Sequence, residues 1–214
     1  MTDTQFLTRP HDWGLGIPLG WTPSASPSAS TDVVGHVFFR DQIVSLDALA
    51  YTLWTAALLG DVDFARCGDP DYSPPGVARL HSSTGTLYSP AQIAAAAQRV
   101  QDTGLLWHFD PMETSGYQAA EHMEVAVQGI PLGNVDRADR YRIAHNDGSP
   151  ALDLEGVAYL VWLQWWSEPA VGKAARAVAD ELGLRRVDVV GQAVRTLTAG
   201  MRTGLLYIAR THNP

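Results

Sequence analysis

The chain has 214 residues, a hydrophobic content of 46% and a net charge of −8, and it holds one cysteine, Cys67. This length allows one or two domains, the apolar content excludes a disordered chain, and the single cysteine excludes an internal disulfide. The negative charge argues against broad binding to nucleic acids or anionic membranes. Neither a signal peptide nor a membrane span is expected from the sequence, and we predict a cytoplasmic protein.

The first part of the chain is predicted to form one unit over residues 33–110, after an N-terminal segment and Pro/Ser linker at residues 1–32. A β-hairpin is expected first, because residues 33–40 alternate loosely and residues 42–45 follow a tight turn at Arg40–Asp41. The later elements, in chain order, are a helix at 46–59, a loop-rich stretch at 60–89 with a helical remnant at 75–80, and a helix that Pro90 opens.

The last part of the chain is predicted to form a second unit over residues 119–210, after a connector at residues 110–117. A second β-hairpin is expected from residues 121–130 and 137–145, which are joined by a Pro- and Gly-containing turn at residues 131–134. Three helices and a short strand complete this unit, at residues 154–166, 170–182, 187–203 and 205–208. The first of these helices is apolar nearly all round, which is typical of a buried helix.

Two matched words indicate an internal repeat. LDALAYTLW at Leu46–Trp54 and LEGVAYLVW at Leu154–Trp162 share Leu, Ala, Tyr and Trp at an offset of 108 residues. TGLLW at Thr103–Trp107 and TGLLY at Thr203–Tyr207 follow in the same order at an offset of 100 residues. The pattern predicts an α+β protein, mainly helical, with two tandem winged-helix-like units that each consist of a hairpin, helices and a terminal strand. The first copy has lost most of its second helix.

The second unit resembles the PqqD-like domain. The resemblance rests on a hairpin, a helix with an L-[DE]-x-x-A-Y-x-x-W word, a helix that ends in A-x-E-L-G-L, and a long V-x-x-x-V-x-x-L-x-x-x-M-x-x-G-L-L helix. It covers Glu121–Ile208 well and Val33–Phe109 poorly. The resemblance implies a RiPP recognition element, a non-catalytic module without a cofactor that binds the precursor or leader peptide of a ribosomally made natural product. The implied partners are that peptide and a modifying enzyme.

The same resemblance implies how the peptide binds. In the family, the peptide adds as an extra strand to a sheet edge and packs beside the third helix. The expected edge here is the strand at residues 137–145, and its arginines and those of the third helix would suit an acidic peptide. The predicted peptide-binding residues are Arg140, Arg142, Ile143, Gln192, Arg195, Thr198 and Arg202. The oligomeric state stays open, with a homodimer among the alternatives.

Two other functions remain as alternatives. A winged-helix domain that binds DNA places its third helix in the major groove. Residues 151–214 carry seven basic against six acidic residues, which is a small excess for a DNA-binding face, so DNA is the less favoured partner. A structural interaction subunit is the second alternative. The contacts in the DNA alternative would be Arg185, Arg186, Gln192, Arg195 and Arg202, with Arg210 on the wing side.

No group of residues in the sequence is typical of an enzyme. His122–Glu124 has the H-x-E spacing of zinc deaminases, but the paired cysteines of that chemistry are missing. The acidic residues between Asp61 and Asp71 lack the spacing, glycine and terminal glutamate of a calcium loop. Cys67 has no base paired with it in the sequence, so we interpret it as an incidental thiol. We therefore predict no catalytic activity, no metal site and no cofactor.

Overall fold

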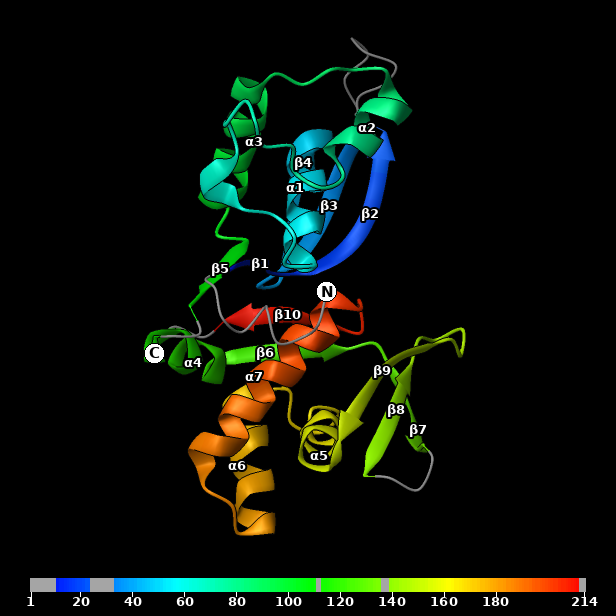
Figure 1. Ribbon diagram of the computed structural model, residues 1–214, viewed down its shortest axis with the longest axis vertical. Helices are drawn as coiled ribbons and strands as arrows, with labels where there is room; N and C mark the ends of the chain where they lie inside the picture. Colours follow the sequence, from blue (N-terminus) through cyan, green and yellow to red (C-terminus); the bar gives the residue numbers. More distant parts are fainter. Residues whose placement is uncertain (1–10, 24–32, 111–112, 136–138, 212–214) are drawn as a thin grey trace. The chain divides into compact units, whose positions relative to one another are not determined.

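A computed structural model describes residues 11–23, 33–110, 113–135 and 139–211 (Figure 1). The chain divides into two compact units, which we call the first unit, His11–Phe109, and the second unit, which contains the described residues from Asp110 onward. The fold is α+β, and more residues lie in helices than in strands. Among the described residues, every helix is too short or too polar to cross a membrane.

The first unit contains two antiparallel sheets and three α-helices. A three-stranded sheet has the order β2-β3-β4, and β1 pairs with β5. Arg40 and Asp41 have φ angles of 51° and 62°, as in a type I′ turn, which confirms the predicted hairpin of β3 and β4. The elements are β1 (His11–Gly14), β2 (Ile17–Pro23), β3 (Val33–Phe39), β4 (Gln42–Asp47), α1 (Ala48–Leu58), the 3₁₀ turn η2 (Phe64–Arg66), α2 (Val77–Thr84), α3 (Pro90–Asp102) and β5 (Leu106–Phe109).

The second unit contains a further three-stranded sheet, a two-stranded sheet and four helices. The strand orders are β7-β8-β9 and β10-β6, and all pairs are antiparallel. The predicted three helices and terminal strand are confirmed within a few residues. The elements are α4 (Thr114–Glu121), β6 (Met123–Val127), β7 (Ile130–Asn134), β8 (Arg140–Ala144), β9 (Pro150–Glu155), α5 (Gly156–Gln164), α6 (Val171–Leu182), α7 (Arg186–Arg202) and β10 (Leu206–Thr211).

The two units have the same order of elements and matching strand registers. From β1 and from β6 onward, each consists of a strand, a three-stranded sheet, three α-helices and a closing strand. The closing strand begins with the same hydrogen bond in both, from Leu15 N to Leu105 O and from Gln128 N to Leu205 O, each at 2.8 Å. These equivalences support the predicted internal repeat and extend it over the strands.

A third repeated word, in addition to the two that indicate the internal repeat, lies at the equivalent position of both units. GIPLG occurs at residues 16–20 and again at residues 129–133, at the start of β2 and of β7. In both strands the register shifts between the proline and the following glycine, which is a β-bulge. Gly20 and Gly133 have φ angles of 94° and 90°, a conformation that glycine adopts without strain. The repeated word therefore has a structural cause in the bulge.

Several sequence-based boundaries need correction. The first unit begins at His11 rather than residue 33, because Trp13 is buried and β2 pairs with β3. Most of the expected Pro/Ser linker lies outside the described residues. The expected hairpin of residues 121–130 and 137–145 is wrong, since β6 pairs with β10 and the expected turn at 131–134 belongs to strand β7. Part of the expected connector forms α4.

Candidate functional site

The predicted peptide-binding strand is not a sheet edge. β8 is the central strand of its sheet, with β7 on one side and β9 on the other. Strand addition needs unpaired backbone N–H and C=O groups, so this part of the predicted site is wrong. Ile143 is fully buried and therefore has no surface to offer a peptide.

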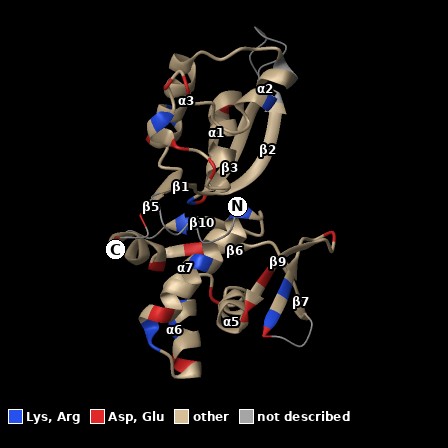
Figure 2. Ribbon diagram, in the orientation of Figure 1, with Lys and Arg blue, Asp and Glu red and all other residues tan. Residues whose placement is uncertain are grey.

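The two arginines of β8 are engaged with an acidic residue of β9. Arg142 donates to Asp153 at 2.8 and 3.0 Å, and Arg140 donates to the same carboxylate at 3.3 Å. Figure 2 shows the basic segments of β8 beside an acidic segment of β9. The hydrogen bond from Arg142, with the positive charges of both arginines, holds the pKa of Asp153 below its ordinary value. The pair that the sequence assigned to an acidic peptide thus already binds a carboxylate.

The predicted residues of the third helix lie along α7 and differ in accessibility. Arg195 is exposed and donates to the side-chain oxygen of Gln192 at 2.7 Å. Thr198 is buried and donates to the carbonyl of Arg195, so it lies on the core-facing side of α7 and not on a binding surface. Arg202 is half-buried near the end of the helix.

Two arginines of the DNA alternative, Arg185 and Arg186, form ion pairs at the start of α7. Arg185 donates two hydrogen bonds to Asp188, at 2.9 and 3.0 Å. Arg186 forms an ion pair with Glu121 of α4. A phosphate backbone would have to compete with these carboxylates for the guanidinium groups. The pairing gives no support to a DNA-binding face on this helix.

Two other strands provide open sheet edges. Among the described residues, β4 pairs with β3 alone and β9 pairs with β8 alone. The opposite edges, β2 and β7, each contain the bulge and a proline that has no N–H, features that protect an edge from further pairing. β4 contains no proline and pairs with β3 without a register shift. β9 begins with Pro150 and has a register shift at that end, while its residues from Leu152 onward pair regularly with β8. β4 is therefore the edge best suited to an added strand, followed by the regular part of β9.

The turn that precedes β4 fixes which backbone groups face the open side. Phe39 and Gln42 flank the two-residue turn at Arg40–Asp41 and form a hydrogen-bonded pair in a hairpin of this type. Since such pairs alternate along an antiparallel ladder, Ile43 and Ser45 direct their backbone N–H and C=O away from β3. Ile43 is also 63% exposed, the most exposed large apolar side chain of this strand.

A groove lies between the open strand β4 and the third helix of the first unit. Its volume is about 240 Å³. Asp47 caps α1 by accepting from Leu49 N and Ala50 N, and its second oxygen pairs with Arg99 of α3 at 2.7 Å. Asp102 accepts a hydrogen bond from Gln98 at 2.8 Å. The groove is lined by Ser45, Leu46, Asp47, Ala50, Arg99, Asp102 and Thr103.

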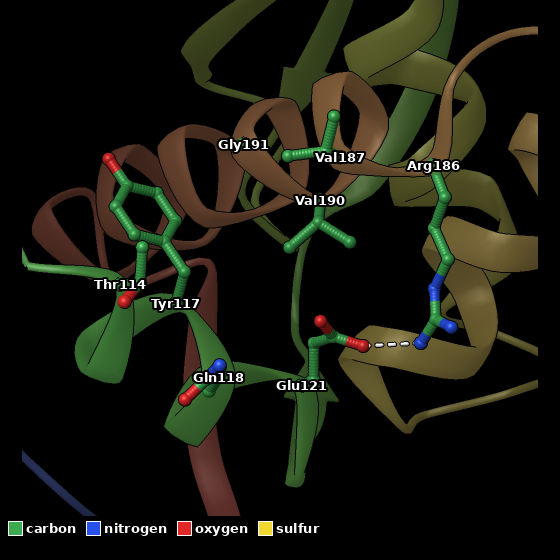
Figure 3. Close-up of a pocket in the computed structure, with 8 residues that line it drawn as sticks. All are labelled: Thr114, Tyr117, Gln118, Glu121, Arg186, Val187, Val190 and Gly191. Atoms are coloured by element: carbon green, nitrogen blue, oxygen red, sulfur yellow. Dashed lines mark hydrogen bonds and ion pairs between the residues drawn. The ribbon is translucent and has the colours of Figure 1, made fainter.

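The second unit has a larger pocket, of about 630 Å³, between α4 and the first turns of α7 (Figure 3). The ion pair of Glu121 and Arg186 links the two helices at one end of it. Val187, which follows Arg186 in α7, is 70% exposed and contributes apolar surface to the lining. This volume falls within the range of small-molecule sites. The remaining lining residues are Thr114, Tyr117, Gln118, Val190 and Gly191.

The one thiol is poorly suited to act as a nucleophile. Burial, followed in size by the negative charges of Asp63 and Asp12, raises the pKa of the Cys67 thiol from 9.0 to about 11. The thiol also donates to the carbonyl of Asp63 at 3.6 Å. At neutral pH the group is therefore protonated, whereas thiolate is the reactive form. Within the described ranges, no three His, Cys, Asp or Glu side chains are grouped as metal ligands.

We expect alkylation of Cys67 by iodoacetamide at pH 8 to be about tenfold slower in the folded than in the unfolded protein. The raised pKa lowers the thiolate population about a hundredfold, and the greater basicity returns about tenfold in reactivity. Mass spectrometry of timed samples gives the rate in buffer and in urea. Asp12→Asn should speed the folded reaction, because it removes one of the charges that disfavour thiolate. Equal rates in the two states would contradict the raised pKa.

Comparisons with known protein families, with curated proteins and with solved structures find no match.

Proposed function

We propose that this protein is a non-catalytic adaptor that binds a precursor peptide and presents it to a modifying enzyme in ribosomal natural-product biosynthesis. In this proposal both units are winged-helix-like and PqqD-like, and the second has the closer sequence resemblance. The observation that carries the proposal is the open third strand of each three-stranded sheet, β4 and β9, among the described residues. Each of these strands lies beside the third helix of its unit.

Strand addition supplies affinity through the backbone. The outward N–H and C=O groups of Ile43 and Ser45 can form hydrogen bonds with an extended peptide, which would then be the fourth strand of the sheet. Asp153 stands at the matching position of β9, because its pairing with Arg142 corresponds to that of Ser45 with His36. A net contribution of about 0.5–1.5 kcal/mol for each hydrogen bond makes a few such bonds enough for weak, reversible binding.

The groove beside β4 supplies the side-chain part of recognition. Alternate side chains of an added strand point to the same face of the sheet, so every second residue of the peptide would reach the groove next to α3. The lining combines apolar surface from Leu46 and Ala50 with the charged groups of Asp47, Arg99 and Asp102. A peptide bound in this way stays extended and exposes its other segments, which is what presentation to a modifying enzyme requires.

Proline substitutions at the open edges test the proposal. A binder is first selected against the full chain from a displayed library of random short peptides. Ser45→Pro is expected to weaken its binding about tenfold if it occupies β4, because proline removes one outward N–H and no hydrogen bond of the β3–β4 ladder. Asp153→Pro is the matched change for β9. Fluorescence anisotropy with the labelled peptide measures both.

Alanine at the same positions provides the control, since Ser45→Ala and Asp153→Ala keep the backbone donor. These variants should bind within about twofold of the wild type, apart from any direct side-chain contact. Circular dichroism and thermal unfolding verify that each proline variant is folded. Wild-type affinity in both folded proline variants would contradict strand addition at these edges.

A further inference from the structure

We propose that the groove beside β4 in the first unit selects extended peptides in which basic residues alternate with apolar ones. The proposal rests on the proposed function, because it names the class of peptide that the same edge takes. It differs from the expectation drawn from the sequence, which placed the site in the second unit and assigned it an acidic peptide.

The charge of the first unit favours a basic peptide. Residues 11–109 contain nine aspartates, no glutamate, four arginines and no lysine. The resulting field of one sign attracts a cationic ligand and raises its association rate at low ionic strength. Within this unit, the groove itself contributes two carboxylates, Asp47 and Asp102, against the single guanidinium of Arg99.

The two carboxylates of the groove differ in their bonding. Asp47 is satisfied by the first turn of α1 and by Arg99, so its charge is largely balanced. Asp102 receives a neutral amide donor from Gln98, and no ion pair to it is formed by the described residues. It is exposed at the end of α3, where a lysine or arginine of a bound peptide could pair with it. Asp102 is therefore the specificity-determining residue in this proposal.

The strand geometry assigns the two kinds of peptide side chain to different faces. Leu46 is buried and lines the groove together with Ser45 and Asp47, which lie on the opposite face of β4, so the groove lies at the open edge where an added strand would run. Ile43 is exposed and its neighbour along the same face, Ser45, bonds to His36 of β3. Successive side chains of an extended peptide point to opposite faces. If the basic side chains point toward Asp102, the side chains between them therefore lie on the face of Ile43. An apolar residue there would cover its exposed side chain.

The matching position in the second unit carries the opposite charge. The TGLL words align α3 with α7 at an offset of 100 residues. In this alignment Arg202 corresponds to Asp102, and Ala199 corresponds to Arg99. The preference for a basic peptide is therefore a property of the first unit. The division of charge between the repeats suits two binding edges that accept different segments.

Two labelled peptides, (Val-Lys)4 and (Val-Glu)4, test the preference on the full chain by fluorescence anisotropy. We expect (Val-Lys)4 to bind about tenfold tighter at low salt, with the difference shrinking at high salt. Asp102→Asn should weaken (Val-Lys)4 by about two- to fivefold, as expected for a solvent-exposed ion pair. Asp71→Asn, which removes the same charge from an exposed loop outside the groove, should have a smaller effect. Equal or tighter binding of (Val-Glu)4, or equal effects of the two variants, would overturn the proposal.

Backbone methylation separates failure of this proposal from failure of strand addition. Successive N–H groups of a strand point to opposite edges, so methylating all valine nitrogens or all lysine nitrogens of (Val-Lys)4 blocks one edge each. Strand addition requires that one methylated peptide loses binding and the other keeps it. If this holds but the two charge types bind equally, only the basic preference is wrong. If the basic peptide is preferred and both methylated forms bind, strand addition is wrong. If neither (Val-Lys)4 nor (Val-Glu)4 binds, both the basic preference and strand addition are wrong.

Discussion

Trp162→Ala is expected to destabilise the second unit by about 3–5 kcal/mol, the range for truncating a large core side chain. Trp162 is fully buried, on the helix α5. Its ring lies edge-on to Trp165 at 6.4 Å. The close approach of Gly129 and Gly200 to the same ring leaves little freedom for neighbouring backbone to fill the space that alanine would create. Urea unfolding followed by circular dichroism measures the loss, and an unchanged midpoint would contradict the core assignment.

The equivalent tryptophan of the first unit provides a sharper comparison. Trp54 is also fully buried, and its indole N–H donates to Leu15 O at 3.0 Å. The indole nitrogen of Trp162 is buried without an acceptor among the described residues. Trp54→Phe should therefore cost about 1–3 kcal/mol more than Trp162→Phe, because only the first change leaves a buried carbonyl unsatisfied. Equal losses would mean that the hydrogen bond to Leu15 contributes little.

The helical part of the fold could be predicted because its signals are local. The words around Trp54 and Trp162, the proline that opens α3 and the glycine that ends α6 each act within one or two turns of the chain. The same holds for the β3–β4 hairpin, whose two-residue turn lies between alternating strands. These elements agree with the expectations within a few residues.

The second three-stranded sheet could not be predicted, because its first strand resembles a turn. Pro131 and Gly133 normally indicate a loop, but here the glycine forms a bulge and the proline lies in an edge strand. Without β7, the sequence pattern predicts β8 as an edge strand, and the expected binding residues Arg140 and Arg142 depend on that prediction. The repeated GIPLG word would have revealed β7, since its first copy precedes the confirmed hairpin.

The candidate groove depends on contacts that no local pattern encodes. Asp47 and Arg99 are far apart in the sequence and meet only because α3 packs beside the N-terminus of α1. The family resemblance covers the second unit better than the first, and it therefore placed the expected site in the second unit. What distinguishes β4 is the combination of an open edge, outward backbone groups and a neighbouring helix, which is a property of the sheet order.

Gly35→Ala is expected to destabilise the first unit by about 1–3 kcal/mol or more, as for an overpacked core. A Cβ atom at this position would lie 2.1 Å from the ring of Tyr51, far inside van der Waals contact. That ring is buried and contacts the rings of Trp21 and Trp54, with centroid-to-centroid distances of 4.3 and 5.3 Å. Neither the ring nor the strand can move without disturbing this cluster, so the added methyl group produces strain rather than extra packing.

The second unit solves the same packing problem in another way. Tyr141 occupies the position of Gly35 and stacks on Tyr159, the counterpart of Tyr51, with ring centroids 4.3 Å apart. In the first unit the covering ring comes instead from Trp21, which pairs with Gly35 across the strands. An aromatic residue thus covers the backbone of a glycine on the neighbouring strand, as in sheets where such pairs compensate for a missing side chain.

Two further variants separate this cause from a general effect of changing glycine. Gly191→Ala adds a methyl group inside α7, where the nearest atom is an arginine nitrogen at 3.7 Å, and should stabilise the helix by about 0.4–1 kcal/mol. Trp21→Ala frees one side of the Tyr51 ring, so combining it with Gly35→Ala should cost less than the sum of the single changes. Strictly additive losses in this double-mutant cycle would show that the clash with Tyr51 is not relieved by ring movement toward Trp21.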